Sequence, residues 1–324
     1  MTQAIRFHHT GGPEVLQLEN IDVGQPGPGE VRIRHTAIGI NFIDTYQRSG
    51  LYPLSLPSGL GSEAAGVVEA VGDGVSQFAV GDRVAYAGGA PGAYSTERVL
   101  AAALLVKLPD NIGDDVAASI MLQGMTVEYL IHRTFAVQPG MTVLWHAAAG
   151  GVGQIAVQWL KALGVEVIGT VGSAAKAEIA RQLGCAHVIN YSEEDVVARV
   201  REITGGKGVP VVYDSVGKST FEMSLNSLAV RGTFVSFGNA SGAVPAFEPL
   251  LLTQKGSLFF TRPKLADYIA KREELEASAQ ALFERIAAGA IRVSPSARYA
   301  LADAAQAHRD LESRRTTGSI ILLP

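Results

Sequence analysis

The amino-acid sequence predicts an α/β protein with two parts, a β-rich barrel-like domain and a doubly wound parallel sheet of six strands. Two observations support this fold class. Residues 1–110 contain short strand-like stretches separated by turns rich in Gly and Pro, a pattern typical of barrels. From residue 141 onward, apolar strand-like runs alternate with helical segments, which predicts parallel strands joined by crossover helices.

The size and composition of the chain are those of a globular protein with two domains. Its 324 residues suffice for two separate cores, and 47% of them are hydrophobic against 18% charged. The net charge of −4 gives no reason to expect nucleic acid or an anionic membrane as a partner. We recognise no signal peptide and no membrane-spanning run, and the single cysteine, Cys185, fits a reducing compartment. We therefore expect a cytoplasmic protein.

The first part is predicted to consist mostly of strands, followed by two helices. The expected strands are Ala4–Phe7, Leu16–Asn20, Glu30–Gly39, Gly66–Val71 and Arg83–Ala85. A helix is expected over residues 114–122, because Asp114 and Asp115 would place carboxylates in its first turn. A second helix is expected over Thr126–Phe135.

The second part is predicted to alternate strands with helices. The expected strands are Met141–Trp145, Val165–Val171, His187–Tyr191, Val209–Asp214, Gly232–Phe237 and Ser257–Thr261. The expected helices between them cover residues 154–163, 173–183, 192–203 and 218–229. A long helix over Lys264–Ala288 and a helix over Leu301–Leu311 follow, and the chain ends in the apolar run Ile320–Leu323. We expect the C-terminal segment to pack back on the first domain, which would make that domain discontinuous.

A glycine-rich turn after the first strand of the parallel sheet predicts a nucleotide-binding site. The strand-like run Met141–Trp145 is followed by small residues, with Ala147, Gly150 and Gly153 at the positions of a dinucleotide fingerprint, and then by a helix. A helix N-terminus offers free N–H groups and a positive dipole end to a phosphate. We therefore expect Gly150, Gly151 and Val152 to line a pyrophosphate.

The end of the next strand predicts the kind of nucleotide. Proteins that bind NAD usually carry an acidic residue there for the ribose hydroxyls. This chain has Gly172, Ser173 and Lys176 instead, so no carboxylate repels a 2′-phosphate, and a hydroxyl and an ammonium group are available to bind one. The sequence therefore favours NADPH over NADH, although Ser173 would serve equally as the cap of an ordinary helix.

Five segments together resemble the NADPH:quinone oxidoreductase family, which includes the zeta-crystallins, within the medium-chain dehydrogenase/reductase superfamily. The resemblance covers essentially the whole chain, and its segments are Gly39–Tyr46, Gly61–Gly66, Ala147–Gly153, Tyr213–Gly217 and Ser236–Asn239. It implies a GroES-like catalytic domain, formed by residues 1–125 and 262–324, and a Rossmann NADPH-binding domain over residues 126–261. It also implies a quinone reductase that transfers reducing equivalents from NADPH in the cleft between the two domains.

Differences from the zinc alcohol dehydrogenases predict an enzyme without metal. Those enzymes have a cysteine where this chain has Asn41-Phe42, and Gly-His-Glu where it has Gly61-Ser62-Glu63. One cysteine in the whole chain supplies neither their catalytic nor their structural zinc ligands. Without a Lewis acid to stabilise an alkoxide, quinones and other activated carbonyls become the expected hydride acceptors. Glu63, beside the lost ligand position, is then expected to be structural.

The resemblance and the sheet topology assign the remaining site residues. Tyr191 and either Arg314 or Arg315 are expected beside the 2′-phosphate, and Ser215 at the carboxyl edge of the sheet, where ligands bind. By resemblance, the nicotinamide side includes Thr126, Phe237, Gly238, Asn239, Phe260 and Thr261, and Asn41 of the first domain is expected to hydrogen-bond a quinone oxygen or the cofactor. Asn41, Tyr46 and Tyr52 are the candidate substrate residues, since they combine an amide with flat aromatic faces that have polar tips.

Two alternative functions remain open, and one partner is expected. An NADPH-dependent 2-alkenal or enone reductase would share the fold and the cofactor, and a non-enzymatic NADPH-binding protein, crystallin-like or RNA-binding, is the alternative from another class. The acidic charge balance argues against RNA as the main ligand. The apolar strand Ser257–Thr261 would form the edge of the sheet, so we expect it to pair with a second copy in a homodimer.

Overall fold

A computed structural model describes residues 1–313 and 316–324, and the chain divides into two compact units. Unit 1 comprises Met1–Met125, Tyr268–Ala287 and Val293–Pro324, and unit 2 comprises Thr126–Asp267 and Ala288–Arg292. Residues 262–267 and 288–292 thus make their contacts in unit 2, whereas the sequence-based bounds assigned them to the first domain. Among the described residues, no helix is both long enough and apolar enough to cross a membrane.

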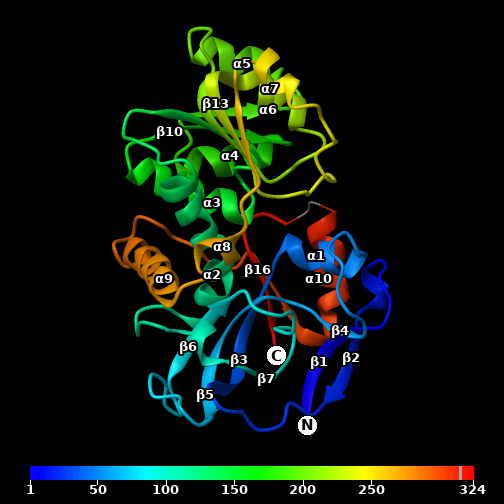
Figure 1. The fold of residues 1–324 in the computed structure, drawn as a ribbon. Helices are drawn as coiled ribbons and strands as arrows, with labels where there is room; N and C mark the ends of the chain where they lie inside the picture. Colours follow the sequence, from blue (N-terminus) through cyan, green and yellow to red (C-terminus); the bar gives the residue numbers. More distant parts are fainter. Residues whose placement is uncertain (314–315) are drawn as a thin grey trace. The chain divides into compact units, whose positions relative to one another are not determined.

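Unit 1 is built from two sheets (Figure 1). One sheet has the order β2-β1-β4, and the other has the order β15-β16-β3-β5-β6-β8 with β7 paired to β3. Their strands are β1 (Thr2–Phe7), β2 (Gln17–Ile21), β3 (Glu30–Ile40), β4 (Ser58–Gly59), β5 (Glu63–Val71), β6 (Arg83–Ala87), β7 (Glu97–Ala101), β8 (Val106–Lys107), β15 (Ala297–Ala300) and β16 (Ile320–Leu323). Val31 and Ile33 of β3 alternate with the more polar Arg32 and Arg34, and both belong to the buried core together with Ile38. The sheets thus enclose one apolar cluster, as a GroES-like barrel domain does.

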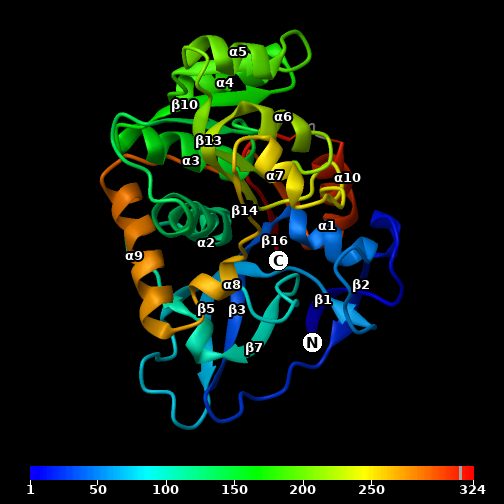
Figure 2. The ribbon, with the colours of Figure 1, turned by 45° about the horizontal axis from the view of Figure 1, so that its top comes forward.

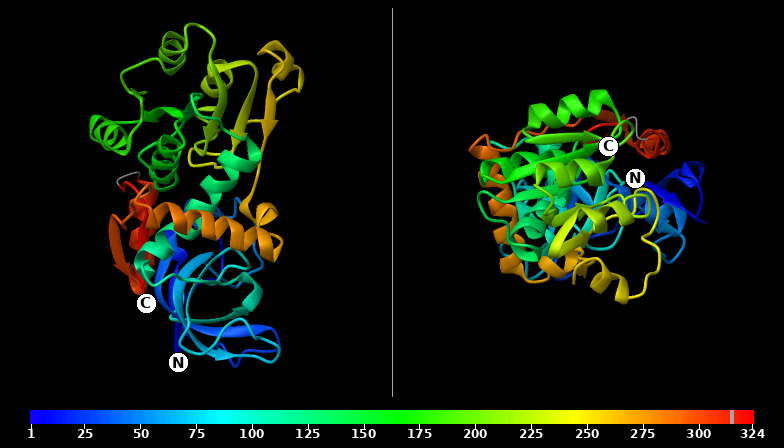
Figure 3. Two further views of the ribbon diagram at one scale, coloured as in Figure 1. Left: turned by 90° about the vertical axis from the view of Figure 1, so that its left-hand side faces the viewer. Right: turned by 90° about the horizontal axis from the view of Figure 1, so that it is seen from above.

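The C-terminal segment completes this unit. Ile320, Ile321 and Leu322 of β16 pair with Ile40, Gly39 and Ile38 of β3 in an antiparallel ladder, and Figure 3 (left) shows the C-terminal strand beside the N-terminal ones. The two helices η4 (Leu301–Asp303) and α10 (Ala304–Glu312) lie between β15 and β16 in the chain. Their residues Leu301, Ala304, Ala307 and Leu311 join the core cluster of unit 1. Unit 1 is therefore discontinuous in sequence.

Several short elements of unit 1 were not predicted from the sequence. They are the strands β4, β7 and β8, the helix α1 (Phe42–Ser49) and the 3₁₀ turns η1 (Pro13–Val15) and η2 (Ala102–Leu104). β4 and β8 have only two residues each, too few for an alternating pattern to emerge. In α1 the polar residues Asp44, Gln47 and Arg48 are buried, so its inner face does not look apolar in the sequence.

The helical segment after residue 113 is continuous where the sequence predicted an interruption. One helix, α2 (Asp114–Tyr129), runs on into a π-helical turn over Leu130–Thr134, where two separate helices were expected. Gly124 does not break this helix. A β-carbon there would lie 2.5 Å from Leu282 Cδ1, so the glycine allows the close approach of α9 (Arg272–Ala287), and Figure 2 shows the two helices side by side.

The single long helix expected over Lys264–Ala288 is also wrong. The structure has a short helix, α8 (Leu265–Tyr268), and then α9, with residues 269–271 between them. The backbone N–H of Lys271 donates to the carboxylate of Glu274, and this bond starts a new helix at that point. The apolar spacing continues across the break, which explains the mistaken prediction.

Unit 2 is a parallel sheet of six strands with the order β11-β10-β9-β12-β13-β14. The strands are β9 (Thr142–Trp145), β10 (Glu166–Val171), β11 (His187–Asn190), β12 (Val209–Asp214), β13 (Leu228–Ser236) and β14 (Phe259–Thr261). Because the chain proceeds outward from β9 in one direction and then from β12 in the other, the strand order reverses between these two strands. Ligands of such sheets bind outside the carboxyl ends of the strands at this reversal.

The helices of unit 2 cover the sheet in two pairs (Figure 1). α3 (Gly151–Ala162) contacts α4 (Ala174–Leu183), and α5 (Val196–Ile203) contacts α6 (Phe221–Ser227). Right-handed crossovers on either side of the strand reversal place the pairs on opposite faces. α5 begins four residues later than predicted because Asp195 caps it, its side chain accepting from the N–H of Ala198 at 2.9 Å. A further short helix, α7 (Leu250–Gln254), precedes β14.

Candidate active site

The turn between β9 and α3 has the features of a phosphate-binding loop. Gly150 is the N-cap of α3 in an extended conformation, and the first N–H groups of this helix, from Gly151 and Val152, have no intrahelical acceptor. Ala147 adopts the left-handed region, with φ 55°, where the fingerprint usually has its first glycine. A β-carbon on Gly153 would lie 2.4 Å from the Ala147 carbonyl oxygen, so the third glycine allows the helix to pack against the turn.

The predicted 2′-phosphate residues of unit 2 lie together at the ends of β10 and β11. A β-carbon on Gly172 would lie 2.3 Å from the hydroxyl oxygen of Tyr191, so this glycine leaves room for the tyrosine side chain. Ser173 caps α4, its hydroxyl oxygen accepting from the Lys176 N–H at 3.3 Å. Tyr191 is 45% exposed. The end of β10 therefore presents hydroxyl and ammonium groups and no carboxylate of its own.

A buried hydrogen-bond network that the sequence did not reveal joins the carboxyl ends of β9, β10 and β12. His146 Nδ1 lies 2.8 Å from Thr170 Oγ1, and Nε2 lies 3.0 Å from Ser224 Oγ. The Ser224 hydroxyl donates to Asp214 Oδ2 at 2.8 Å, so its oxygen accepts from His146 and the proton sits on Nε2. Burial lowers the pKa of His146, while the Asp214 charge opposes this shift. The histidine is therefore neutral near pH 7.

Asp214 also shapes the loop that carries Ser215. Its Oδ1 accepts from the N–H groups of Val216 and Gly217 at 2.7 and 3.0 Å, which fixes the turn after β12. In the loop after the neighbouring strand β13, a β-carbon on Gly238 would lie 2.4 Å from the Ser215 carbonyl oxygen. The predicted residues Ser215, Phe237, Gly238 and Asn239 are thus adjacent at one edge of the sheet.

Three further predicted cofactor residues lie in a core cluster, at a strand end or inside a helix. The Phe260 ring packs edge-on against Phe234, with a centroid distance of 5.2 Å, so its side chain belongs to the apolar cluster beneath the sheet. Thr261 pairs with Val235 at the end of β14. Thr126 is buried within α2. Arg314, like Arg315, lies outside the described residues.

The predicted substrate residues of unit 1 lie along α1 and just beyond its end. Asn41 is the N-cap of this helix and is 6% exposed. The rings of Tyr46 and Tyr52 meet edge to face at 5.3 Å, and the Tyr52 N–H donates to the Tyr46 carbonyl at 3.0 Å. The helix therefore has the amide at its start and the two aromatic rings together near its end.

Two buried carboxyl groups that the sequence did not assign to the site hold Asn41. Asp44 Oδ2 accepts from the backbone N–H of Asn41 at 2.8 Å, and Glu63 Oε2 accepts from its side-chain Nδ2 at 2.7 Å. Glu63 Oε1 also accepts from the Leu122 N–H at 2.7 Å, and Gln123 Nε2 donates to Asn41 Oδ1 at 3.1 Å. The signal that the sequence offers for this arrangement is the Glu63 that remains beside the lost zinc-ligand position.

Burial dominates the titration of both carboxyl groups. It raises the pKa of Glu63 to about 8, although the hydrogen bonds from Asn41 and Leu122 lower it and the Asp44 charge raises it. Burial raises the pKa of Asp44 to about 7, although the Asn41 N–H and the Tyr94 hydroxyl lower it. Asp44 Oδ1 has no hydrogen-bond partner among the described residues. Both groups therefore change charge within the pH range in which enzymes are usually assayed.

Asp44 also ends a buried chain of hydrogen bonds that fixes α1. The Tyr94 hydroxyl donates to Asp44 Oδ2 at 2.9 Å, and His308 Nε2 lies 3.1 Å from the Tyr94 oxygen. His308 Nδ1 accepts from Arg48 at 3.0 Å, and Arg48 pairs with Glu312 through two bonds of 2.6 and 3.1 Å. Burial and the Arg48 charge lower the pKa of His308 to about 3, so the imidazole is neutral. The chain links α1 to α10.

Two observations concern groups outside this site. Within residues 1–313 and 316–324, no cluster of three or more His, Cys, Asp or Glu side chains is arranged to hold a metal ion. Burial raises the pKa of Cys185 to about 12, which makes its thiol unreactive.

Comparison with known proteins identifies the family. A model of the zinc-binding dehydrogenases matches residues 151–282, and a model of the alcohol dehydrogenase GroES-like domain matches residues 27–110. A quinone oxidoreductase of Pseudomonas aeruginosa is 57% identical over the full length of both chains. The chain belongs to the quinone oxidoreductase family.

Other members of the superfamily resemble the chain over its full length. The crystal structure of Escherichia coli quinone oxidoreductase, complexed with NADPH, is 53% identical and has a TM-score of 0.98, with all of both chains covered. A 2-haloacrylate reductase of Burkholderia sp is 48% identical, with 100% of this chain and 99% of the relative covered. The quinone oxidoreductase family thus matches both units, in agreement with the resemblance seen in the sequence.

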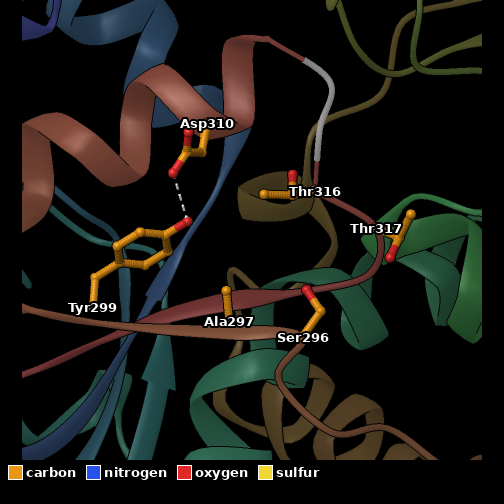
Figure 4. A pocket seen from close by; sticks show the side chains of 6 residues that line it. All are labelled: Ser296, Ala297, Tyr299, Asp310, Thr316 and Thr317. Atoms are coloured by element: carbon orange, nitrogen blue, oxygen red, sulfur yellow. Dashed lines mark hydrogen bonds between the residues drawn. The ribbon is translucent and has the colours of Figure 1, made fainter.

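A pocket in unit 1 is lined by none of the residues predicted for the family's site. It has a volume of about 320 Å³ and is lined by Ser296, Ala297, Tyr299, Asp310, Thr316 and Thr317 (Figure 4). The Tyr299 hydroxyl donates to Asp310 Oδ2 at 2.9 Å across it, so two of its polar groups already satisfy each other.

Proposed function

We propose that the chain is an NADPH-dependent quinone reductase that acts without zinc. The observation that carries this proposal is the carboxyl edge of the six-stranded sheet, where a free helix N-terminus and an acid-free strand end lie beside the strand reversal. Relatives named quinone oxidoreductases, one of them complexed with NADPH, support the same substrate and cofactor. When bound, NADPH supplies the hydride that reduces the quinone.

The residues of unit 2 would bind and orient the cofactor. The N–H groups of Gly151 and Val152 suit the pyrophosphate, and Ser173, Lys176 and Tyr191 suit the 2′-phosphate. The network of His146, Ser224 and Asp214 would hold these loops in place without contacting the ligand, because its polar atoms are occupied by one another and by backbone groups. The other predicted cofactor residues, Gly150, Gly172, Ser215, Phe237, Gly238, Asn239, Phe260, Thr261, Thr126 and Arg314, complete the proposed set.

The residues of unit 1 would receive the quinone. Asn41 can hydrogen-bond a quinone oxygen or the cofactor, and the rings of Tyr46 and Tyr52 offer flat apolar surfaces to a flat substrate. The side chains at the positions of the zinc ligands do not suit zinc. The positions of the usual cysteine and histidine ligands hold Asn41-Phe42 and Ser62, whose amide and hydroxyl oxygens are not ligands that zinc prefers. The quinone is thus positioned by hydrogen bonds and aromatic contacts.

The test is the oxidation of NADPH by a small quinone, followed by the absorbance of the reduced nicotinamide. Parallel reactions would contain NADH in place of NADPH, or an enone in place of the quinone, with a metal chelator present throughout. We expect chelator-resistant turnover that strongly favours NADPH and the quinone. Equal use of NADH would contradict the proposed 2′-phosphate site, and faster reduction of the enone would contradict the proposed substrate.

We further propose a cytoplasmic homodimer that pairs through β14. This strand forms one edge of the sheet in unit 2, and Phe259 on it is 62% exposed. An unpaired apolar edge is usually covered or joined to another strand. Pairing two copies about a two-fold axis would cover the β14 edge of each copy.

A further inference from the structure

The side-chain amide of Asn41 belongs to a chain of hydrogen bonds that crosses unit 1. Asn41 Nδ2 donates to Glu63 Oε2 at 2.7 Å, and Asn41 Oδ1 accepts from Gln123 Nε2 at 3.1 Å. Gln123 Oε1 lies 2.8 Å from Ser319 Oγ, which in turn lies 3.1 Å from the Ser119 carbonyl oxygen. The four side chains of this chain are buried, with exposures between 0% and 6%.

Glu63 sets the direction of this chain. An ionised carboxylate is only an acceptor, so Asn41 must turn its NH₂ group toward Glu63 and its oxygen toward Gln123. Gln123 must then donate through Nε2, which leaves its oxygen facing Ser319, and the Ser319 hydroxyl donates to it. Every member is satisfied in this arrangement.

The same chain is also satisfied in the reverse direction when Glu63 is protonated. The carboxylic acid can then donate to Asn41 Oδ1, while its carbonyl oxygen still accepts from the Leu122 N–H. Asn41 would donate to Gln123, Gln123 to Ser319 Oγ, and Ser319 to the Ser119 carbonyl, which lies within reach. The two arrangements differ by the rotation of two amide groups, and the reverse one turns the Asn41 NH₂ group toward the first turn of α1, where the Asn41 side chain otherwise takes part in a capping box with Asp44.

We propose that Glu63 is a positioning residue whose protonation state selects the orientation of the Asn41 amide, and thereby which of its two polar ends faces Glu63 and which faces Gln123. This inference rests on the proposed role of Asn41 in contacting the quinone or the cofactor. Because Asn41 would offer its remaining donor and acceptor sites in exchanged positions, the two states would bind a quinone oxygen with different strength.

The surroundings of Glu63 favour a titrating group with defined geometry. A β-carbon on Gly39 would lie 2.4 Å from Glu63 Oε2, so the carboxyl group is packed directly against β3 on one side and is held by the α2 backbone on the other. The titratable groups that act on it electrostatically are Asp44 on α1, Tyr86 on β6 and Tyr94. Arg98 donates to the Tyr86 hydroxyl at 3.1 Å. The shift of the Glu63 pKa to about 8 is consistent with exchange between the two states near neutral pH.

The variant Glu63→Gln tests the proposal because it locks one direction. The Leu122 N–H requires an acceptor, so the introduced amide would turn its oxygen toward Leu122 and its NH₂ group toward Asn41, as the protonated acid does. We expect kcat/KM for the quinone in the unmodified protein to change up to about tenfold between about pH 6 and 9.5, roughly the effect of one hydrogen bond. Because Asp44 also titrates near pH 7, the decisive protein combines Glu63→Gln with Asp44→Asn. This double variant should show no transition, and its value should match the acid plateau of Asp44→Asn alone.

The comparison variant is Asp44→Asn, which removes a neighbouring charge but keeps Glu63. Because the Asp44 charge raises the pKa of Glu63, this variant should shift the transition to lower pH without abolishing it. A double variant of Glu63→Gln and Asp44→Asn that keeps the transition, or whose value matches the alkaline plateau of Asp44→Asn, would overturn the proposal.

An infrared measurement separates this inference from the proposed function. The carbonyl stretch of a protonated carboxyl group should disappear as the pH rises through the same range, and Glu63→Gln should lack the part of this signal that belongs to Glu63. If that signal is present while no quinone is reduced, the proposed function fails and the titration of Glu63 stands. If the carboxyl signal of the unmodified protein and that of the variant are identical, the switch itself is wrong.

Discussion

At the scale of single residues, two acids determine how the protein responds to pH. Asp44 and Glu63 are fully buried, and burial raises their pKa values from 3.8 to about 7 and from 4.5 to about 8. A raised pKa in the folded state means that the folded chain holds these protons more tightly than the unfolded chain. The stability that they contribute is therefore largest at low pH and is lost as the pH rises toward 8.

We expect the free energy of unfolding to fall by several kcal/mol between about pH 5.5 and pH 9, since each pKa unit corresponds to about 1.4 kcal/mol. Urea unfolding at a series of pH values measures this change. Asp44→Asn should make the fall smaller, because one of the two titrating groups is gone. Asp267→Asn, on the surface and paired with Lys264, is the control and should leave the slope unchanged. An equal slope in Asp44→Asn would contradict the assignment.

The choice of cofactor also depends on individual residues. Lys176 lies in the first turn of α4, next to the Ser173 cap and the end of β10. We expect Lys176→Ala to raise KM for NADPH about 10- to 100-fold, since a hydrogen bond to a charged group contributes about 1.5–3 kcal/mol, and to leave KM for NADH nearly unchanged. Lys207→Ala, at an exposed loop of unit 2, is the matched control. A similar loss with both cofactors would mean that Lys176 does not bind the 2′-phosphate.

At the scale of elements, α2 and α9 pack closely because Gly124 of α2 has no side chain. Gly124 lies within α2, where glycine costs about 1 kcal/mol relative to alanine. The buried Leu282 of α9 occupies the space that a side chain at position 124 would need. Close packing of the two helices therefore outweighs the helix propensity of this position.

We expect Gly124→Ala to destabilise the protein by about 1 kcal/mol, because overpacking costs about 1–3 kcal/mol and the gain in helix propensity offsets part of it. In a Leu282→Ala background the same change should stabilise the protein by about 1 kcal/mol, since the clash is removed and the propensity gain remains. Denaturant unfolding of the four proteins gives both values. Destabilisation of equal size in both backgrounds would show that Leu282 is not the cause.

At the scale of the whole molecule, the edge strand β14 decides the proposed assembly. We expect light scattering to give twice the mass of one chain, and Phe259→Lys to give the mass of one chain, since a charge on an edge strand opposes pairing. Leu18→Lys, on the edge strand β2 of unit 1, is the control and should keep the higher mass. A single-chain mass at every concentration would contradict the proposed homodimer.

The sequence by itself determined the class of the fold and the nucleotide-binding turn. Strand and helix periods, the spacing of Ala147, Gly150 and Gly153, and the missing acid after β10 are local features, so they remain readable without tertiary contacts. The six strands of unit 2 and their parallel order followed from the same alternation. The family was recognised from short segments for the same reason.

Only the tertiary structure decided which polar residues surround the candidate site. Asn41, Glu63, Gln123 and Ser319 come from distant parts of the chain, yet they form one buried network. Buried polar side chains must find partners, and those partners come from whichever elements pack nearby. For the same reason no local pattern indicates that Gly124 continues a helix, because its role depends on Leu282 in a distant one.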